Sequence, residues 1–297
     1  MPTAVSADNE IRAYPELPGQ CRPARFVRVL LQTVLDDLRA EQEELDALAG
    51  SLTEAQWRLA TPSPGWTVAH QIAHLAWCDD AALLAVTDKQ AFLAFLDSVR
   101  TDPQAHIDRG AAEGAAASPE DLLARWRAGR GVLLSTLRRI DAGSKLAWFG
   151  QPLNVVTLGT ARLMEVWAHG LDVADALGVT REPTHRLRHI AYLGVRTRDN
   201  AFHRRGLTPP EPFRVSLSGP DNQVWTWGPP EADQRVTGTA LDFCKLITRR
   251  IHRDDTTLTA VGADAERWLH IAQCFAGPPG PGRPPKTTDT RFGACSG

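Results

Sequence analysis

The amino-acid sequence predicts an α+β protein, in which a four-helix bundle is followed by a small α/β C-terminal domain. Two observations support this prediction. Up to residue 178, the long segments repeat apolar residues with the period of a helix, as the helices of a bundle do. After residue 212, short segments alternate apolar and polar residues, which is typical of strands. The four bundle helices are expected at residues 26–49, 67–86, 119–140 and 156–177.

The first of these helices is the clearest, because Leu31, Val34 and Leu38 recur on one face. The spacing of Ser51-Leu-Thr-Glu54 is that of a capping box and predicts a short helix that runs through Trp57. Thr67 is a suitable N-cap residue for the second bundle helix.

The middle of the chain alternates helices and loops. Asp88 is expected to cap a helix that ends near residue 99, and the Ala/Gly-rich segment 110–118 is expected to be a loop. Ser118 precedes a proline, which is typical of the start of a helix. Residues 141–156 are expected to form another loop, and the last bundle helix should end at Gly178.

The C-terminal part mixes helices and strands. A helix is expected at 185–206, and the alternating segments FRVSLSG and QVWTWG predict a β-hairpin. Strands at 234–238 and 256–262 and helices at 239–251 and 265–276 should follow. The expected organisation is a tail at 1–25, a metal-binding bundle at 26–182, the small domain at 183–276 and a Pro/Gly-rich tail at 277–297.

The net charge, the apolar runs and the cysteines of the sequence limit the kinds of binding partner and cellular compartment that are expected. The 297 residues carry a formal net charge of −2 and no long basic run, so neither nucleic acid nor an anionic membrane surface is expected as a partner. No apolar run approaches the roughly 18 residues of a membrane span. The five cysteines show no CxxC spacing, and the N-terminus lacks the apolar stretch of a signal peptide. A cytoplasmic protein without a disulfide framework is therefore expected.

Candidate metal ligands recur in the segment VAHQIAHLAWCDD, residues 68–80. His70, His74 and Cys78 follow one another at intervals of four, so on a helix they lie along one face. Two histidines at this spacing also arise by chance, and a cysteine on an apolar helix is often a small core residue. The segment alone therefore leaves packing and metal binding open.

A second segment, RLMEVWAHGLD, places Glu165 and His169 four residues apart on the last bundle helix. The pair could be a surface contact, but the helix is apolar on most sides, and a buried carboxylate needs a partner. Bundles commonly build metal sites from facing helices. A His₂Glu set that includes His74 would leave positions open, as catalytic zinc sites do, although non-haem iron uses the same ligand types.

The two motifs, WTV-x₅-H and E-x₃-H, resemble those of the DinB-like, mycothiol-dependent maleylpyruvate isomerase superfamily. The later part of the chain resembles an actinobacterial branch known only as metal-binding proteins, and the likeness extends over about residues 26–282. The resemblance implies a DinB-like bundle, a metal that is usually zinc, and ligands at His74, Glu165 and His169.

The resemblance also implies mycothiol as a thiol cosubstrate. His70 and Cys78 depart from the family's ligand positions and are expected to line the pocket or to add a fourth ligand. Further contacts to the ligands or the cofactor are expected from Asp79 and Arg162, and also from Asp80 and Asp172.

The implied function is that of an S-transferase or isomerase in which a metal-bound thiolate attacks an electrophilic small molecule. His74, Glu165 and His169 would then act in catalysis as the ligands. Two alternatives stay open: a metal–water hydrolase with a base such as His70, and a non-enzymatic, metal-stabilised binding protein whose site is closed by His70 or Cys78. The sequence does not identify the substrate.

Overall fold

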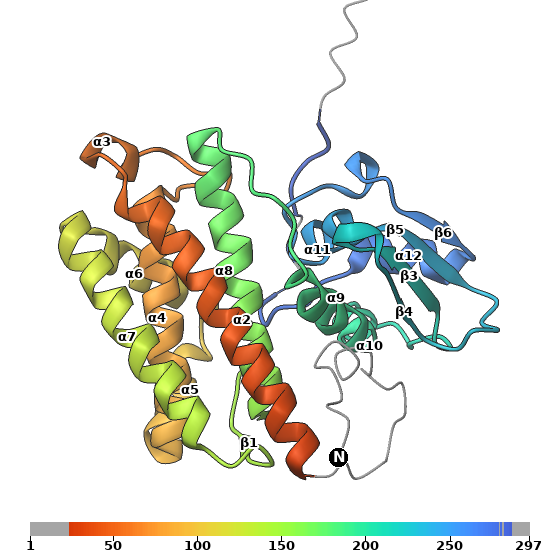
Figure 1. Ribbon diagram of the computed structural model, residues 1–297, viewed down its shortest axis with the longest axis horizontal. Coiled ribbons are helices and arrows are strands. Elements are labelled where there is room, and N and C mark those ends of the chain that lie inside the picture. The colour runs from red at the N-terminus through yellow and green to blue at the C-terminus, as the bar shows by residue number, and fades with distance from the viewer. Residues whose placement is uncertain (1–23, 279, 281, 287–297) are drawn as a thin grey trace, which may run out of the picture.

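The computed structural model describes residues 24–278, 280 and 282–286, and it is an α+β protein with a helical bundle and a small sheet (Figure 1). The bundle helices are α2 (Ala24–Gly50), α4 (Val68–Thr87), α7 (Pro119–Arg139) and α8 (Val155–Leu177). Helices α2 and α4 each pack against both α7 and α8, which closes the bundle. The four long helices predicted from the apolar period are confirmed to within two residues at each end.

The interior of the bundle is apolar and tightly covered. Leu31 and Leu38 of α2, Ile72 of α4, Trp126 of α7 and Leu158 of α8 are fully buried. Each such side chain stabilises the fold by roughly 1.5–3 kcal/mol relative to an exposed one. This core holds α4 and α8 against each other, and the candidate ligands lie on these two helices.

Two of the predicted helix ends have the expected chemistry. Ser118 Oγ accepts a hydrogen bond from the backbone N–H of Asp121 at the start of α7 (3.1 Å). Helix α8 ends at Gly178, whose φ of 67° lies in the left-handed region that glycine adopts without steric cost.

The prediction of a loop at 110–118 is wrong, because helix α6 (Pro103–Ala115) covers most of that segment. Its small residues serve close helix packing. A Cβ atom on Gly114 would lie 2.8 Å from Cβ of Ala73, and one on Gly110 would lie 2.8 Å from Cδ1 of Trp77. The two glycines therefore let α6 approach α4 closely, beside the candidate ligand His74.

Other differences are local. The capping box is formed by Thr53 and Gln56, two residues later than predicted, at the start of α3 (Glu54–Trp57). The expected loop at 141–156 contains the short hairpin β1 (Lys145–Leu146) and β2 (Leu153–Asn154). The helix expected at 185–206 is broken at Thr197, whose hydroxyl donates to the Leu193 carbonyl (2.9 Å). The resulting pieces are α9 (Leu187–Arg196) and α10 (Arg198–His203), and α5 spans Lys89–Val99.

The C-terminal part forms a four-stranded sheet in the order β4-β3-β5-β6. The predicted hairpin is confirmed: β3 pairs antiparallel with β4, and β5 adds parallel to β3. Val215, Trp225 and Val236 point into the core that the sheet shares with Phe243 and Trp268. The elements are β3 (Arg214–Ser218), β4 (Val224–Trp227), β5 (Arg235–Thr239), α11 (Ala240–Ile247), β6 (Thr259–Val261) and α12 (Ala263–Ile271), with 3₁₀ turns at Pro220–Asn222 and Arg253–Asp255.

Charged side chains join the two parts of the molecule. Helix α9 packs against both α8 and α11. Glu41 of α2 is 1% exposed and accepts hydrogen bonds from Arg181 (2.5 Å) and Arg186 (2.6 Å), which lie in the segment between α8 and α9. On α8, the fully buried Asp172 pairs with Arg250, which follows α11 (2.9 Å). The C-terminal part is therefore anchored to α2 and also to α8, where Asp172 lies three residues after the candidate ligand His169.

None of the helices in the described ranges is long and apolar enough to cross a membrane.

The close approach of α6 to α4 can be tested by adding one methyl group. We expect Gly114→Ala to lower the free energy of unfolding by about 1–3 kcal/mol, because the overpacked Cβ would push α6 away from α4. Gly131→Ala in α7 is the matched control, because its Cβ meets nothing within 4 Å and should raise stability by roughly 0.5–1 kcal/mol. Urea unfolding of both variants is the measurement. A stabilised Gly114→Ala variant would contradict the packing account.

Candidate metal centre

Three side chains from two bundle helices converge at one point. His74 comes from α4, and Glu165 and His169 come from successive turns of α8. One ligand atom from each lies within 4.8 Å of the others. Oε2 of Glu165 is 3.1 Å from Nε2 of His169 and 3.9 Å from Nε2 of His74. Both histidines are less than 10% exposed. The packing of α4 on α8 therefore produces the His₂Glu arrangement.

The tautomer of His169 is fixed by a chain of hydrogen bonds that ends at a backbone carbonyl. The Thr61 hydroxyl donates its one proton to the carbonyl of Trp66 (2.9 Å). Its oxygen must therefore accept from the side-chain amide of Gln71 (2.8 Å). That orientation turns the amide oxygen of Gln71 toward Nδ1 of His169. Because an amide oxygen only accepts, Nδ1 of His169 carries the proton and Nε2 presents a lone pair.

This arrangement places two hydrogen-bond acceptors face to face. Burial, with the nearby positive charge of His74, lowers the pKa of His169 to about 4, so its ring is neutral near pH 7. Although burial opposes its charge, the positively charged His74, as a hydrogen-bond partner and a nearby charge, contributes to holding the pKa of Glu165 well below its usual value. The lone pair of His169 Nε2 thus faces an ionised carboxylate oxygen. A cation between them would turn this repulsion into an attraction.

His74 supplies the local positive charge. Burial alone would lower its pKa, but Cys78 and Glu165, as charges and hydrogen-bond partners, raise the pKa to about 9. Its Nε2 is 3.3 Å from Sγ of Cys78. Its Nδ1 is buried and has no hydrogen-bond partner. A divalent ion at this point would therefore displace a proton from His74.

Beneath the cluster lies a buried ion pair. Nε of Arg162 donates to Oδ1 of Asp79 (3.1 Å), and the two side chains are 2% and 0% exposed. Burial disfavours the charged guanidinium, but the charges of Cys78, Asp79 and Glu165 keep the pKa of Arg162 above its usual value. The pair sits against the charges of the candidate ligands and links α4 to α8. Its predicted contact with a cofactor stays a prediction.

His70 and Cys78 lie beside the cluster rather than within it. Nδ1 of His70 accepts from the backbone N–H of Thr67 (3.3 Å) and lies 2.8 Å from its hydroxyl, so this ring caps the start of α4. Cys78 reaches His74, but its sulfur does not belong to the group of mutually close ligand atoms. Among the residues that the structure describes, the group of mutually close ligand atoms comes from three side chains, and a fourth ligand stays a prediction.

Two acidic residues that the sequence analysis placed near the ligands have other partners. Asp80 is exposed and pairs with Arg125 of α7 (2.8 Å). Asp172 joins Arg250, Arg283 and the hydroxyl of Ser63, and so ties the C-terminal part to α8. Sequence reasoning also missed Gln71, because no spacing rule connects it to His169, which is 98 residues away.

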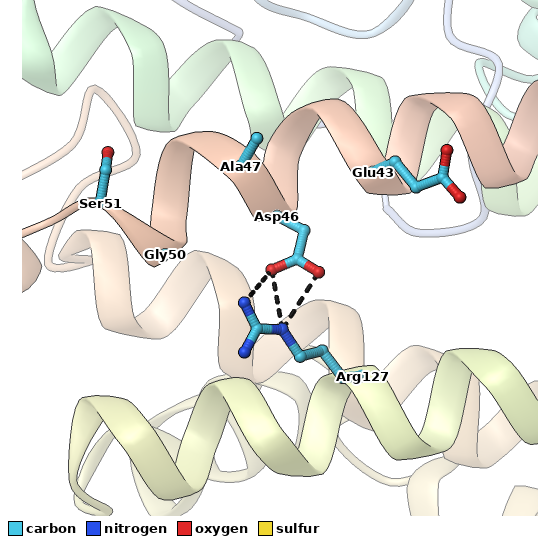
Figure 2. A pocket seen from close by; sticks show the side chains of 6 residues that line it. All are labelled: Glu43, Asp46, Ala47, Gly50, Ser51 and Arg127. Carbon is cyan, nitrogen blue, oxygen red and sulfur yellow. Dashed lines mark hydrogen bonds and ion pairs between the residues drawn. The ribbon is translucent and has the colours of Figure 1, made fainter.

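A shallow pocket elsewhere on the bundle has a different character (Figure 2). It lies between α2 and α7 and is lined by Glu43, Asp46, Ala47, Gly50, Ser51 and Arg127. Asp46 accepts two hydrogen bonds from Nε of Arg127 (2.9 and 3.1 Å) and also pairs with Arg130. Because two arginines neutralise the charge of the Asp46 carboxylate, this pocket is a poor candidate for a metal site. The cluster on α4 and α8 is therefore the candidate metal centre.

The tautomer of His169 can be observed directly. In the metal-free protein, we expect ¹⁵N NMR of the His169 ring to show a proton on Nδ1 and none on Nε2 from about pH 5 to 8, since its pKa is about 4. Gln71→Leu removes the acceptor and should move the proton toward Nε2, where Glu165 accepts it. Gln42→Leu is the control, because Gln42 is a buried glutamine whose side-chain amide has no hydrogen-bond partner. An Nε2–H tautomer in the unmodified protein would refute the relay.

The buried ion pair has an exposed neighbour as its control. Asp79→Asn should lower the free energy of unfolding by about 3–5 kcal/mol, because it removes the carboxylate that pairs with the buried guanidinium of Arg162. Asp80→Asn should cost less than about 1 kcal/mol, since Asp80 and Arg125 are half-exposed. Chemical denaturation compares the two variants. An Asp79→Asn/Arg162→Met double variant should recover most of the stability lost in Asp79→Asn. Equal losses of stability in Asp79→Asn and Asp80→Asn would show that burial of the first pair is energetically unimportant.

Comparison with known proteins agrees with this architecture. Residues 38–174 match the family model of the mycothiol maleylpyruvate isomerase N-terminal domain. Two uncharacterized proteins of Mycobacterium tuberculosis, Rv0036c of strain H37Rv and MT0041 of strain CDC 1551, are each 56% identical over 248 residues, which is 83% of this chain and 96% of theirs.

The fold also matches solved structures. A crystal structure of the mycothiol-dependent maleylpyruvate isomerase has a TM-score of 0.54 at 18% identity, over 77% of this chain and 92% of that chain. A histidine-to-alanine mutant of that enzyme gives a TM-score of 0.53 at 16% identity over the same shares. At this identity the likeness establishes a common fold. Residues 38–174 therefore belong to the family of mycothiol maleylpyruvate isomerase N-terminal domains, and the whole chain belongs to one family with the two Mycobacterium tuberculosis proteins.

Proposed function

We propose that this protein is an enzyme that binds a divalent metal ion, zinc in the simplest case, and uses mycothiol as a thiol cosubstrate in an S-transfer or isomerisation reaction. The observation that carries the proposal is the convergence of His74, Glu165 and His169 at one point of a bundle with this family's fold. The mycothiol-dependent isomerase among the structural neighbours supports the choice of thiol.

The residues present fit a metal ion. Two imidazole nitrogens and a carboxylate oxygen form the donor set of many catalytic zinc sites, which keep a further position open. The lone pair of His169 and the ionised Glu165 face each other without a proton between them, and a cation satisfies both. Gln71 would hold the His169 ring in the tautomer that a ligand needs.

A divalent cation at this point would lower the pKa of a coordinated thiol, so that the nucleophilic thiolate predominates at neutral pH. The chain's own residues would orient the reactants. Glu165, as a ligand, does not act as a general base. The paired Arg162 and Asp79 hold α4 and α8 at a fixed separation. The rings of Trp66 and Trp77 lie beside His74 and screen its buried face from water.

The proposal is tested by metal analysis followed by titration with the thiol. The purified protein should contain about one zinc ion per chain, and His74→Ala should lose it. His70→Ala is the matched control, because it removes a histidine four residues earlier on the same helix that lies outside the cluster, and it should keep the metal. The zinc-loaded protein should then bind mycothiol saturably in calorimetry.

Three results would contradict the proposal. A protein without metal would leave the cluster as a packing feature. Stoichiometric zinc without thiol binding would favour metal–water hydrolysis or a purely structural site. Loss of zinc in the His70→Ala variant would show that the proposed set of ligands is wrong.

A further inference from the structure

A group of aromatic rings extends from the candidate ligands toward the surface of the bundle. We call it the aromatic group, and it comprises Trp66, Trp77, Phe92, Phe95, His106, Trp148 and Phe149. Its members come from the segment before α4 and from α4, α5, α6 and the loop between β1 and β2. Segments far apart in the sequence therefore supply one continuous set of rings.

The rings begin in direct contact with the candidate ligands. The ring of Trp66 lies 5.2 Å from that of His74 and 6.1 Å from that of His169, nearly parallel to the latter. Trp77 stacks on His74 at 6.0 Å. Phe95 lies 5.8 Å from Trp77 and carries the contact outward.

The outer rings continue this path. Phe95 lies 6.2 Å from Phe149 and 5.6 Å from His106. Phe149 in turn lies 5.2 Å from Trp148, which stacks on the fully buried Phe92 at 5.7 Å. A path of ring contacts thus connects the ligand cluster with the loop between β1 and β2.

Most of these rings are only half-buried. Phe92 is fully covered, whereas Trp66, Trp77, Phe95 and Phe149 are partly exposed and lie outside the main hydrophobic cluster of the bundle. Partly exposed aromatic rings beside a set of convergent polar groups are typical of a ligand site.

The charge beside the aromatic group is unfavourable for an anionic substrate. Arg162 is neutralised by Asp79. Arg250 and Arg283 are both paired with Asp172. On the aromatic side, Asp108 accepts a hydrogen bond from the indole N–H of Trp66 (3.2 Å) and contributes a negative charge. A dicarboxylate that approached along the rings would meet this carboxylate, whereas an uncharged molecule would not.

We propose that the aromatic group binds the electrophilic substrate, and that this substrate is a planar, uncharged molecule with an aromatic ring or an equally extended conjugated system. The inference rests on the proposed function, because it takes the reacting carbon to lie close to the His74–Glu165–His169 cluster. Offset and edge-on contacts with Trp77, Phe95 and Phe149 would orient the plane of such a molecule.

The test measures binding of three probes in the absence of thiol, so that no reaction occurs. The probes are cinnamamide, crotonamide, which has the same unsaturated amide without the ring, and maleate, a small dicarboxylate. Calorimetry with the full-length, zinc-loaded protein should give cinnamamide an affinity about tenfold or more above that of the other two. The indole N–H signals of Trp66 and Trp77 should shift on addition of cinnamamide.

Variants locate the binding surface. Phe95→Leu and Phe149→Leu should each weaken cinnamamide binding about three- to tenfold while zinc stoichiometry stays unchanged. Tyr192→Leu, which removes a half-buried ring from α9 in the C-terminal part, should leave cinnamamide affinity unchanged. Thermal unfolding of each variant shows that it is folded.

The outcomes separate this inference from the proposed function. If the protein binds stoichiometric zinc, three results would overturn the substrate class and leave the metal centre intact. These are equal affinity for crotonamide and cinnamamide, tighter binding of maleate, and cinnamamide binding that is unchanged in both phenylalanine variants. A protein that takes up no zinc would overturn the proposed function, and this inference with it.

Discussion

The candidate centre depends on one contact, in which the lone pair of His169 Nε2 faces the ionised carboxylate of Glu165 at 3.1 Å. A chain of donors and acceptors enforces this geometry, since the carbonyl of Trp66 can only accept, and each partner along the chain through Thr61 and Gln71 is then fixed. The lone pair of His169 and the carboxylate oxygen of Glu165 therefore repel each other inside the bundle, and a cation bound between them would remove this repulsion.

The fold accommodates these polar groups by pairing charges across helices. Arg162 on α8 is matched by Asp79 on α4, and Asp172 on α8 is matched by Arg250 beyond α11. The first pair fixes the two ligand-bearing helices to each other, and the second brings the C-terminal part against α8. Such pairs contribute little net stability compared with an apolar core, but removing one partner is costly. Their position around the cluster is therefore better understood as a constraint on geometry than as a source of stability.

Much of the fold could be predicted from the sequence, because local patterns determine it. The 3.6-residue period located the four bundle helices, and Gly178 marked the end of α8. The small residues at 110–118 predict a loop, but most of them lie in helix α6. Glycines that destabilise an isolated helix permit close packing when another helix lies alongside. The break at Thr197, where the backbone leaves helical geometry, was not predicted from the local pattern either.

The site was predictable only in part. The four-residue spacings and the family resemblance predicted that His74, Glu165 and His169 would lie together, and the structure brings them together, while their role as ligands stays a prediction. Gln71 could not be found in this way, because its contact with His169 joins residues on different helices and no motif marks it. The aromatic group was also invisible, since its rings come from separate elements and meet only after α5 and α6 have folded over α4.

The most direct test of the account is X-ray absorption spectroscopy of the zinc-loaded protein, before and after addition of mycothiol. An open His₂Glu site predicts a first coordination shell of nitrogen and oxygen only, and one sulfur ligand at about 2.3 Å once the thiol is added. The same spectra from a Cys78→Ser variant should be identical. Sulfur in the resting protein that disappears in Cys78→Ser, or no sulfur after mycothiol is added, would contradict an open thiol-binding centre.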